Sequence, residues 1–589
     1  MQTQHITFRF AAVLAVLAGG AGLGCRSAST WPFPFREPLA VDTDMAPVNL
    51  PCRPDPSPKD PKRLRCAPEE YVPAPGWDHI NNSVFDPISQ ALSVEAVGEA
   101  VNVNSMDEIP DSAWFTNRLG ARPMSVEEVA AGGCKPEDSL DALEEQAAPG
   151  SWVIDRGKSD GASFGFRVDI PGKGKYMLKT DDAVQPEQAN AGAVIGAAIY
   201  HAAGYNTTCE QVIYFRRELL KLTPGLIATN NQGISHPFDE AALDKGLSTT
   251  STHDGLIRMT ASKWLSGLTI GPYTFQGLRR DDPNDVIHHE HRRDLRGSRL
   301  IAAWLNHWDA RDQNSMDVWI ASDATHERSS PGYVRHYVLD TSDVIGQAPN
   351  PPELSRRLGH SYYVDPRDFL FDLVTLGIPE RPWDRAHYTP GHERFAWFSD
   401  RDFDAEGWKP SYPNPAFTRM TERDGAWMAR ILARFSREQI AAIVGAARFS
   451  NPSDPPYLVD ILMRRRQNIL ERYFGRLSPV TDVHGEADGR VCAVDLARAT
   501  GVFAADRFRY EVVQESRGDR TALPVTTGPD GVLCFAPRPL GSGGGADGVL
   551  AHYTRIVIHN GAVPGPLEMQ AYDLGARGMR IVGVRRPAP

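Results

Sequence analysis

The spacing of apolar and polar positions predicts a mixed α/β structure in the middle of the chain. Between residues 151 and about 350, short β-like runs alternate with helical ones. Strands are expected at residues 164–168, 176–178, 212–215 and 256–259. An Ala-rich helix is expected at residues 187–203, where Gly204 provides a suitable C-terminal stop. A second helix is expected at residues 296–308, because its apolar residues fall on one face.

The pattern changes twice more toward the C-terminus. Residues 352–477 read as helical, and Ser436 with Gln439 forms a capping box that opens one of these helices. Pro456 then opens a helix at residues 457–473. After residue 480, short β-branched runs separated by Gly, Asp and Pro predict a small all-β, sandwich-like domain. Its expected strands are at residues 509–513, 532–535, 554–559 and 579–584.

The N-terminus is typical of an exported protein. Arg9 precedes an apolar run at residues 11–23, which suits a signal peptide at residues 1–24 and is too short to span a bilayer. Cys25 follows a small residue at the end of this run, so it resembles the lipidated cysteine of a bacterial lipoprotein. Ordinary cleavage nearby is the alternative. No Asp follows Cys25 directly, a pattern that favours the outer membrane over retention at the inner one.

Two further segments precede the mixed region. Residues 25–75 are rich in proline and are expected to form an extended tether. Residues 76–150 contain a short acidic helical stretch from Ser125, which Gly132 ends, and are expected to pack on the domain that follows. The exported chain would therefore be held at the cell envelope through its N-terminus without spanning the membrane.

The cysteines agree with export. Without Cys25, six remain, and their proximity in sequence favours disulfides between Cys52 and Cys66 and between Cys492 and Cys534. Cys134 and Cys209 are the remainder, and their pairing is the least determined. No CxxC spacing is present, which argues against a zinc site.

Length and charge narrow the class of protein. A chain of 589 residues exceeds one ordinary core, so more than one domain is expected. Its 41% hydrophobic and 23% charged residues are typical of a soluble globular protein. A formal net charge of -11 argues against a nucleic-acid partner, which would favour a basic face.

Three polar residues suggest phosphotransfer chemistry. Asp309 and Asn314 lie just beyond the helix predicted at 296–308, and Asp340 ends the apolar run 337–339. In kinases, one aspartate orients a hydroxyl and accepts its proton, while an asparagine and a second aspartate hold magnesium on the nucleotide phosphates. Asp343 is a rival to Asp340 for the metal.

Upstream residues complete this set in the order that a kinase requires. Gly161 and Gly165 lie in a turn between strand-like runs and could cover phosphates. Lys179 ends the strand at 176–178, where its ammonium could reach phosphate oxygens, and Glu187 opens the next helix, where it could pair with Lys179.

Residues 150–475 therefore resemble the atypical protein-kinase-like superfamily, in the style of HipA-like and CotH-like kinases. The resemblance is carried by Lys179, by Glu187 in "EQANAGAVIGAAIYHAAG", by "NHWDARDQN" and by "VLD". It implies a two-lobed kinase-like domain at residues 151–477, followed by the β-rich domain at 480–589. It further implies ATP and Mg²⁺ as cofactors, with Asp309 as the catalytic base. Lys179, Glu187, Gly161 and Gly165 would serve ATP binding, and Asn314 and Asp340 would be the metal ligands.

Two other motifs indicate structural roles and not a functional site. The segment at 287–291 is rich in His, yet it lacks the HExxH spacing and is expected to be a polar helix start in which Glu290 or Asp294 pairs with nearby arginines. Trp114 and Phe115 are expected to be packing residues.

The expected function is ATP- and Mg²⁺-dependent phosphotransfer to a hydroxyl of a protein or an envelope molecule. Two alternatives remain. An envelope protein meets little ATP, which favours a non-catalytic kinase-like binding module. The same residues could also transfer AMP, as in a nucleotidyltransferase.

Overall fold

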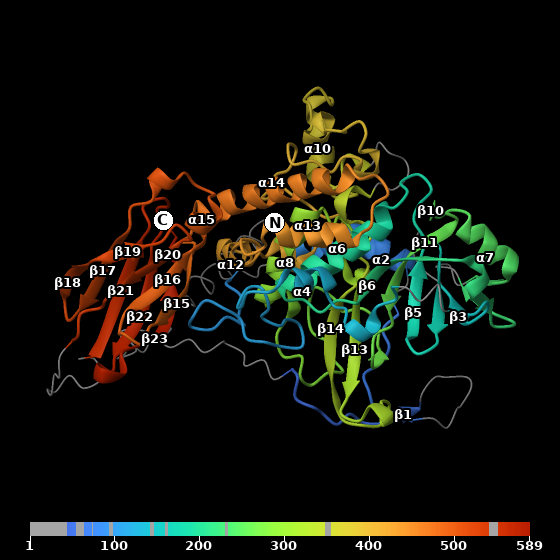
Figure 1. Ribbon diagram of the computed structural model, residues 1–589, viewed down its shortest axis with the longest axis horizontal. Helices are drawn as coiled ribbons and strands as arrows, with labels where there is room; N and C mark the ends of the chain where they lie inside the picture. Colours follow the sequence, from blue (N-terminus) through green and yellow to red (C-terminus); the bar gives the residue numbers. More distant parts are fainter. Residues whose placement is uncertain are drawn as a thin grey trace, which may run out of the picture.

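The computed structural model shows a mixed α/β protein (Figure 1). It describes residues 44–54, 64–72, 75–92, 98–141, 147–158, 163–229, 234–347, 355–540 and 552–588. Cys25 and Gly161 lie outside the described residues. The mixture of helices and sheets agrees with the expected α+β class.

A seven-stranded sheet forms the first part of the mixed region. Its strands are β3 (Trp152–Gly157), β4 (Gly165–Ile170), β5 (Gly174–Lys179), β6 (Glu210–Phe215), β7 (Leu220–Leu222), β10 (Thr252–His253) and β11 (Leu256–Lys263). β3, β4 and β5 follow one another as an antiparallel meander, and β11 pairs with both β5 and β6. The four strands expected from the sequence in this region are confirmed. The helix α7 (Glu240–Leu247) packs its Leu243 into the core of this sheet.

Helices form a second core. They are α4 (Val126–Ala131), α6 (Gln188–Ala203), α8 (Arg293–Leu305), α11 (Pro415–Thr418), α12 (Glu422–Leu432), α13 (Arg437–Ala446) and α14 (Asp454–Phe474). Helix α10 (Pro366–Thr375) lies outside this core. The capping box predicted at Ser436 is present, and the helix expected from Ser125 also begins with a capping box, formed by Ser125 and Glu128. The second helix of the mixed region was placed wrongly, since it begins at Arg293 and ends at Leu305. Asn306 adopts a left-handed backbone (φ 55°) and stops it there.

Helix α6 contacts the loop after strand β14 (Gly332–Val338) at very short range. β14 pairs with β13 (Ser315–Ala321), which also pairs with β12 (Leu268–Thr269). A Cβ atom on Gly196 would lie 2.5 Å from Cβ of Thr341, and one on Gly192 would lie 2.8 Å from the carbonyl oxygen of Ser342. Only glycine permits this approach, so two residues of α6 determine how closely the loop packs on it.

The C-terminal part consists of two sheets around one core. One contains β15 (Val480–Gly485), β16 (Val491–Asp495), β19 (Val525–Thr527) and β20 (Val532–Phe535). The other contains β17 (Glu511–Ser516), β18 (Asp519–Leu523), β21 (Tyr553–His559), β22 (Leu567–Asp573) and β23 (Met579–Arg585). Buried side chains of both sheets, among them Leu533 and Ile556, form a single cluster, so the sandwich-like arrangement expected after residue 480 is present. Helix α14 leads into these strands (Figure 1).

One buried carboxylate joins the helical and C-terminal parts. Asp107 forms ion pairs with Arg293 of α8 at 2.7 Å, Arg430 of α12 at 3.6 Å and Arg586 beyond β23 at 2.6 Å. Burial alone would raise the pKa of Asp107, but the three guanidinium groups outweigh it and hold that pKa well below its ordinary value. Arg586 also donates to the carbonyl oxygens of Ser478 and Val480, which anchors the end of the chain to the first C-terminal strand.

Three disulfides join Cys52 to Cys66, Cys134 to Cys209 and Cys492 to Cys534. Both pairings favoured by sequence proximity are confirmed, and the remaining two cysteines also pair. Together they indicate an oxidising, extracytoplasmic compartment. Within the described residues, no helix combines the length and the apolar character that crossing a bilayer requires.

Replacing Asp107 with Asn should destabilise the protein, because three buried arginines lose a shared counter-ion. The expected loss is about 3–5 kcal/mol in the free energy of unfolding, measured by urea denaturation at pH 7. Since the native pKa of Asp107 is lowered, its contribution is present at neutral pH and is lost as the pH falls below about 3.9. Asp488→Asn is the matched control, because Asp488 pairs with a single exposed arginine, and no measurable change is expected. Equal stability of both variants would contradict the joining role of Asp107.

Candidate functional site

The loop between α8 and β13 places Asp309 in a defined orientation. The backbone N–H of Asp309 donates to Oδ2 of Asp343 at 2.8 Å. Its own carboxylate accepts a hydrogen bond from Nδ2 of Asn314 at 3.0 Å and lies 2.9 Å from Nε of Arg311. Nδ2 of Asn314 also donates to the carbonyl oxygen of Asp309 at 2.7 Å. Asp309 and Asn314, which are five positions apart in the sequence, are therefore in direct contact.

Asp340 lies on the neighbouring segment, two residues beyond β14. Its backbone is left-handed (φ 39°), and its carboxylate lies 3.2 Å from Nζ of Lys179 and accepts a hydrogen bond from Ser342 at 2.7 Å. The N–H of Leu339 donates to the carbonyl oxygen of Asn314 at 2.9 Å. The structure thus brings together Lys179 from the sheet, Asp309 and Asn314 from the first loop and Asp340 from the second.

The glycine-rich turn adds a second lysine to this group. Gly165 is paired with Lys179 in the β4–β5 register, and a Cβ atom there would lie 2.6 Å from the carbonyl oxygen of Leu178. Lys158 ends the preceding strand segment and donates from Nζ to Ser163. Its charge also contributes to lowering the pKa of Asp340. Lys158 was not among the site residues predicted from the sequence.

The expected pairing of Lys179 with Glu187 does not form. Glu187 precedes α6 in a left-handed conformation (φ 70°) and forms an ion pair with Arg394. It also accepts a hydrogen bond from the N–H of Ser450 at 3.0 Å. These contacts direct the side chain toward the helical core, so Glu187 fastens the start of α6 there.

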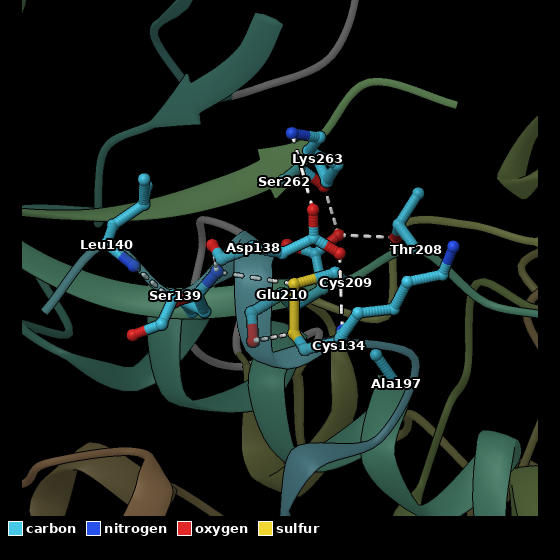
Figure 2. Close-up of a disulfide and its surroundings, with 12 residues drawn as sticks. Cys134, Asp138, Ser139, Leu140, Ala197, Thr208, Cys209, Glu210, Ser262 and Lys263 are labelled. Atoms are coloured by element: carbon cyan, nitrogen blue, oxygen red, sulfur yellow. Dashed lines mark hydrogen bonds and ion pairs between the residues drawn. A yellow bond between two sulfur atoms is a disulfide. The ribbon is translucent and has the colours of Figure 1, made fainter. Parts of the chain in front are cut away.

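A different carboxylate, Glu210 on β6, interacts electrostatically with Lys179. Figure 2 shows Glu210 beside the Cys134–Cys209 disulfide, with Thr208 and Ser262 at its carboxylate. The hydroxyl groups of both residues donate to its Oε1 atom, at 2.6 Å for Thr208. Burial raises the pKa of Glu210, and Lys179 opposes that shift. For Lys179, burial opposes the charge, but Asp340 and Glu210 outweigh it and raise the pKa. No pattern in the sequence distinguishes Glu210, because its partners come from three separate segments.

The two aspartates of the site have opposite electrostatic environments. Burial raises the pKa of Asp309 to about 6, Asp343 adds to the shift, and Arg311 and Asn314 oppose it. Burial would also raise the pKa of Asp340, but Lys179 and Lys158 outweigh it and hold that pKa well below its usual range. Environments that separate the pKa values of two carboxylates are typical of sites that divide acid–base and charge-binding roles.

Asp343 and His307 are buried beside the loop that carries Asp309. Burial raises the pKa of Asp343 well above its ordinary value, and Asp340 adds to the effect. Burial also lowers the pKa of His307 to about 4, so its ring is neutral at pH 7. His307 Nδ1 lies 3.0 Å from the hydroxyl of Tyr200 on α6, and Nε2 lies 3.3 Å from Asp343. Because Oδ2 of Asp343 accepts the hydrogen bond from the N–H of Asp309, Asp343 fixes the backbone at that residue.

The donors available for a metal are hard oxygen atoms. The described residues contain no group of three or more His, Cys, Asp or Glu side chains arranged to hold a metal ion. Asp340 offers a carboxylate. Asn314 directs its amide nitrogen at Asp309 and can offer Oδ1. This pair suits Mg²⁺, which proteins commonly hold through one or two such groups together with substrate phosphates.

The remaining candidate motifs are structural. His289 is buried between the carboxylate of Asp285 (2.8 Å) and the carbonyl oxygen of Thr274. Nearby, Arg292 pairs with Asp294 at 3.3 Å. Trp114 is buried and stacked on His336, with ring centroids 3.5 Å apart. The expectations of a polar helix start and of a packing tryptophan are confirmed.

No known protein family, curated protein or solved structure matches this chain.

Replacing Gly196 with Ala should disturb the contact between α6 and the loop that carries Asp340. The added methyl group would meet Thr341 at 2.5 Å, so a loss of about 1–3 kcal/mol in unfolding free energy is expected from urea denaturation. Gly445→Ala in α13 is the control, because no atom lies within 4 Å of the added carbon. That variant should gain up to about 1 kcal/mol from helix propensity. A neutral Gly196→Ala variant would disprove the tight contact.

Replacing Glu210 with Gln should lower the pKa of Lys179, because one of its two carboxylate neighbours loses its charge. A nearby opposite charge shifts a pKa by about 1–3 units, so the neutral amine at pH 9 should increase roughly tenfold or more. The measurement is the rate at which an amine-reactive reagent labels the Lys179 peptide, followed by mass spectrometry. Glu187→Gln is the control and should leave this rate unchanged, because Glu187 pairs with Arg394. The reverse pattern would identify Glu187 as the partner.

Proposed function

We propose that this protein transfers the γ-phosphoryl group of ATP to a hydroxyl. The observation that carries the proposal is the ion pair between Lys179 and Asp340, formed directly beside the contact between Asp309 and Asn314. These residues come from a strand end and two separate loops, and their roles in a kinase follow the same order along the chain.

The surrounding elements support a kinase-like arrangement. Lys179 ends the third strand of the β3–β4–β5 meander, and the next element is the buried helix α6. In kinases, the phosphate-binding lysine also lies on the third strand and is followed by a helix. The acidic partner differs here, because Glu210 would take the charge-balancing role expected for Glu187.

Lys179, Lys158, Asp340 and Asn314 would bind the nucleotide and its metal. The two lysines would face phosphate oxygens, while Asp340 and Oδ1 of Asn314 would hold Mg²⁺. When bound, Mg²⁺ supplies charge neutralisation for the phosphates. Glu210 would keep Lys179 charged and in position.

Asp309 would act as the base. Arg311 and Asn314 fix its carboxylate, and Asp343 fixes its backbone. A pKa of about 6 leaves most of the carboxylate ionised at pH 7, so it can accept the proton of an acceptor hydroxyl. Most of the rate would come from positioning and from charge stabilisation.

The protein would work outside the cytoplasm, held at the envelope by a lipid on Cys25. The disulfides support the compartment, and the lipid anchor is part of the proposal.

A non-catalytic binding module is the second candidate. The observation that favours it is the engagement of Glu187 by Arg394, which leaves the usual lysine–glutamate pair of a kinase unformed. Such a module would use the same fold to bind a partner at the envelope.

ATP with Mg²⁺ should stabilise the wild-type protein against heat. At an ATP concentration of 100 times the dissociation constant, the expected gain is about 2.7 kcal/mol. Asp340→Asn should lose this gain, because the carboxylate that binds the metal is removed. Asp309→Asn should keep it, and its rate of phosphate transfer from radiolabelled ATP should fall by about 10²- to 10⁴-fold.

Asp254→Asn is the control, because Asp254 lies in an exposed turn and has no place in the site. It should behave as the wild type does in both measurements. A wild-type protein that ATP fails to stabilise, with or without Mg²⁺, would exclude phosphotransfer and favour the binding module.

A further inference from the structure

The large apolar side chains exposed to solvent are concentrated in two segments. In the described residues, 25 such side chains are exposed, and eight of them lie at residues 71–92 and ten at residues 363–388. Soluble proteins rarely expose apolar groups in continuous patches of this kind, so a patch usually marks an interaction surface.

The first segment is α10 with the turn that follows it. Helix α10 projects from the body of the protein (Figure 1), and none of its residues is buried. Its exposed apolar residues are Phe369, Leu370, Phe371, Leu373 and Val374, continued by Leu376 and Ile378. Leu376 is 82% exposed and Phe369 is 71% exposed. With 3.6 residues per turn, the five apolar residues of the helix cover about 200° of its circumference, and Asp368 and Asp372 lie on the remaining side.

The charges beside α10 are largely neutralised by one another. Arg381 forms ion pairs with Asp368 and Asp372 and lies over the ring of Phe371. Arg385 pairs with Glu380 at 2.8 Å. The tip of this segment therefore presents apolar surface with little net charge.

The second segment contains α2 (Pro75–Ile80), the π-helical turn η1 (Asn81–Phe85) and α3 (Asp86–Leu92). Trp77, Ile80 and Phe85 are exposed, as are Val84, Ile88 and Leu92. The rings of Trp77 and Phe85 stack with centroids 5.5 Å apart. An indole with one polar edge suits the boundary between lipid headgroups and acyl chains.

The two segments meet beside Asp309, at Tyr412. Nδ1 of His79 in α2 lies 2.7 Å from the hydroxyl of Tyr412. The ring of Tyr412 contacts that of Tyr363, which lies three residues before α10, at 5.3 Å between centroids. The guanidinium of Arg311, which pairs with Asp309, lies 5.6 Å from the Tyr412 ring centroid. A chain of contacts through the buried Tyr412 therefore connects both segments to the carboxylate proposed as the base.

We propose that residues 71–92 and 363–388 form one face that docks on a lipid bilayer, and that the acceptor is an amphiphile with a hydroxyl-bearing headgroup. We refer to these residues as the apolar face. The identity of the acceptor rests on the proposed phosphotransfer, whereas the docking does not.

A bilayer suits the apolar face better than a protein partner does. A helix that lies in the headgroup region turns a wide apolar side toward the acyl chains and a charged side toward water, and α10 has this arrangement, with Asp368 and Asp372 opposite its apolar residues. The N-terminal sequence also ends its apolar run at Cys25, where a lipid is expected. Stable attachment usually takes more than one membrane signal, and the apolar face would supply another.

Docking in this orientation determines what Asp309 can reach. The oxygen of a headgroup hydroxyl would form a bond to the γ-phosphorus, and the bond from that phosphorus to the β–γ bridging oxygen would break. The hydroxyl proton would pass to the carboxylate of Asp309, and ADP would leave. A soluble acceptor would need access to the same carboxylate past a surface held at the bilayer.

The test uses the full acylated protein in phosphatidylcholine vesicles that contain a photoactivatable lipid. Crosslinked peptides are mapped by mass spectrometry. Crosslinks are expected in residues 363–388 and 71–92, and the double variant Phe369→Ser with Leu373→Ser should reduce them roughly tenfold or more. The matched control is Ile227→Ser with Val286→Ser, which removes exposed apolar groups outside the apolar face and should leave the crosslinks unchanged.

Crosslinks confined to residues 25–70 would overturn the docking. So would a dimer in sedimentation experiments that the Phe369→Ser, Leu373→Ser variant dissociates, because the face would then bind a second copy. Crosslinking at the apolar face by a protein that ATP fails to stabilise would retain the docking and reject the proposed phosphotransfer. Equal phosphorylation of a soluble hydroxyl acceptor with and without vesicles would reject the amphiphilic acceptor.

Discussion

The close contact between α6 and the loop after Asp340 is the constraint on which the site depends. Gly192 and Gly196 allow the loop to approach to a distance that any side chain would prevent. Thr341 then donates to the carbonyl oxygen of Ala193, and Gln188 donates to that of Val344. Because α6 also contacts strands β6 and β11, the loop takes its position from the sheet that carries Lys179. The Lys179–Asp340 ion pair is a consequence of this packing.

Electrostatic balance distinguishes the site from the rest of the interior. At the Asp107 junction, one carboxylate is shared by three arginines and its charge is fully compensated. At the site, Asp340 and Glu210 compensate Lys179, while Asp309 lies in surroundings that favour its neutral form. The first arrangement holds two parts of the protein together. The second leaves a carboxylate able to change its protonation state near neutral pH, as a general base requires.

Docking through the apolar face would orient the candidate site toward the membrane. The disulfides indicate an oxidising compartment, and the proposed lipid would bring the protein to a membrane there. Tyr412 connects both apolar segments to Arg311 and so to Asp309. In this proposal the lipid attaches the protein to the membrane, and the apolar face orients the site. The membrane also supplies the hydroxyl-bearing acceptor.

Local sequence determined much of this protein, because the signals concerned act within a few residues. The capping box at Ser436, the short helix from Ser125, the strands of the mixed region, the end of α6 at Gly204 and two of the disulfide pairings were all predicted correctly. So was the proximity of Asp309 to Asn314. The boundaries of α8 and the partner of Lys179 were predicted wrongly. An electrostatic partner depends on which buried groups approach each other, and Glu210 acts on Lys179 across a sheet whose strands are far apart in sequence. The apolar face is likewise visible only in the folded chain, because the same residues would read as core until the structure shows that nothing in the described chain covers them. Sequence thus supplied the chemical groups, and tertiary packing decided their partners and their exposure to solvent.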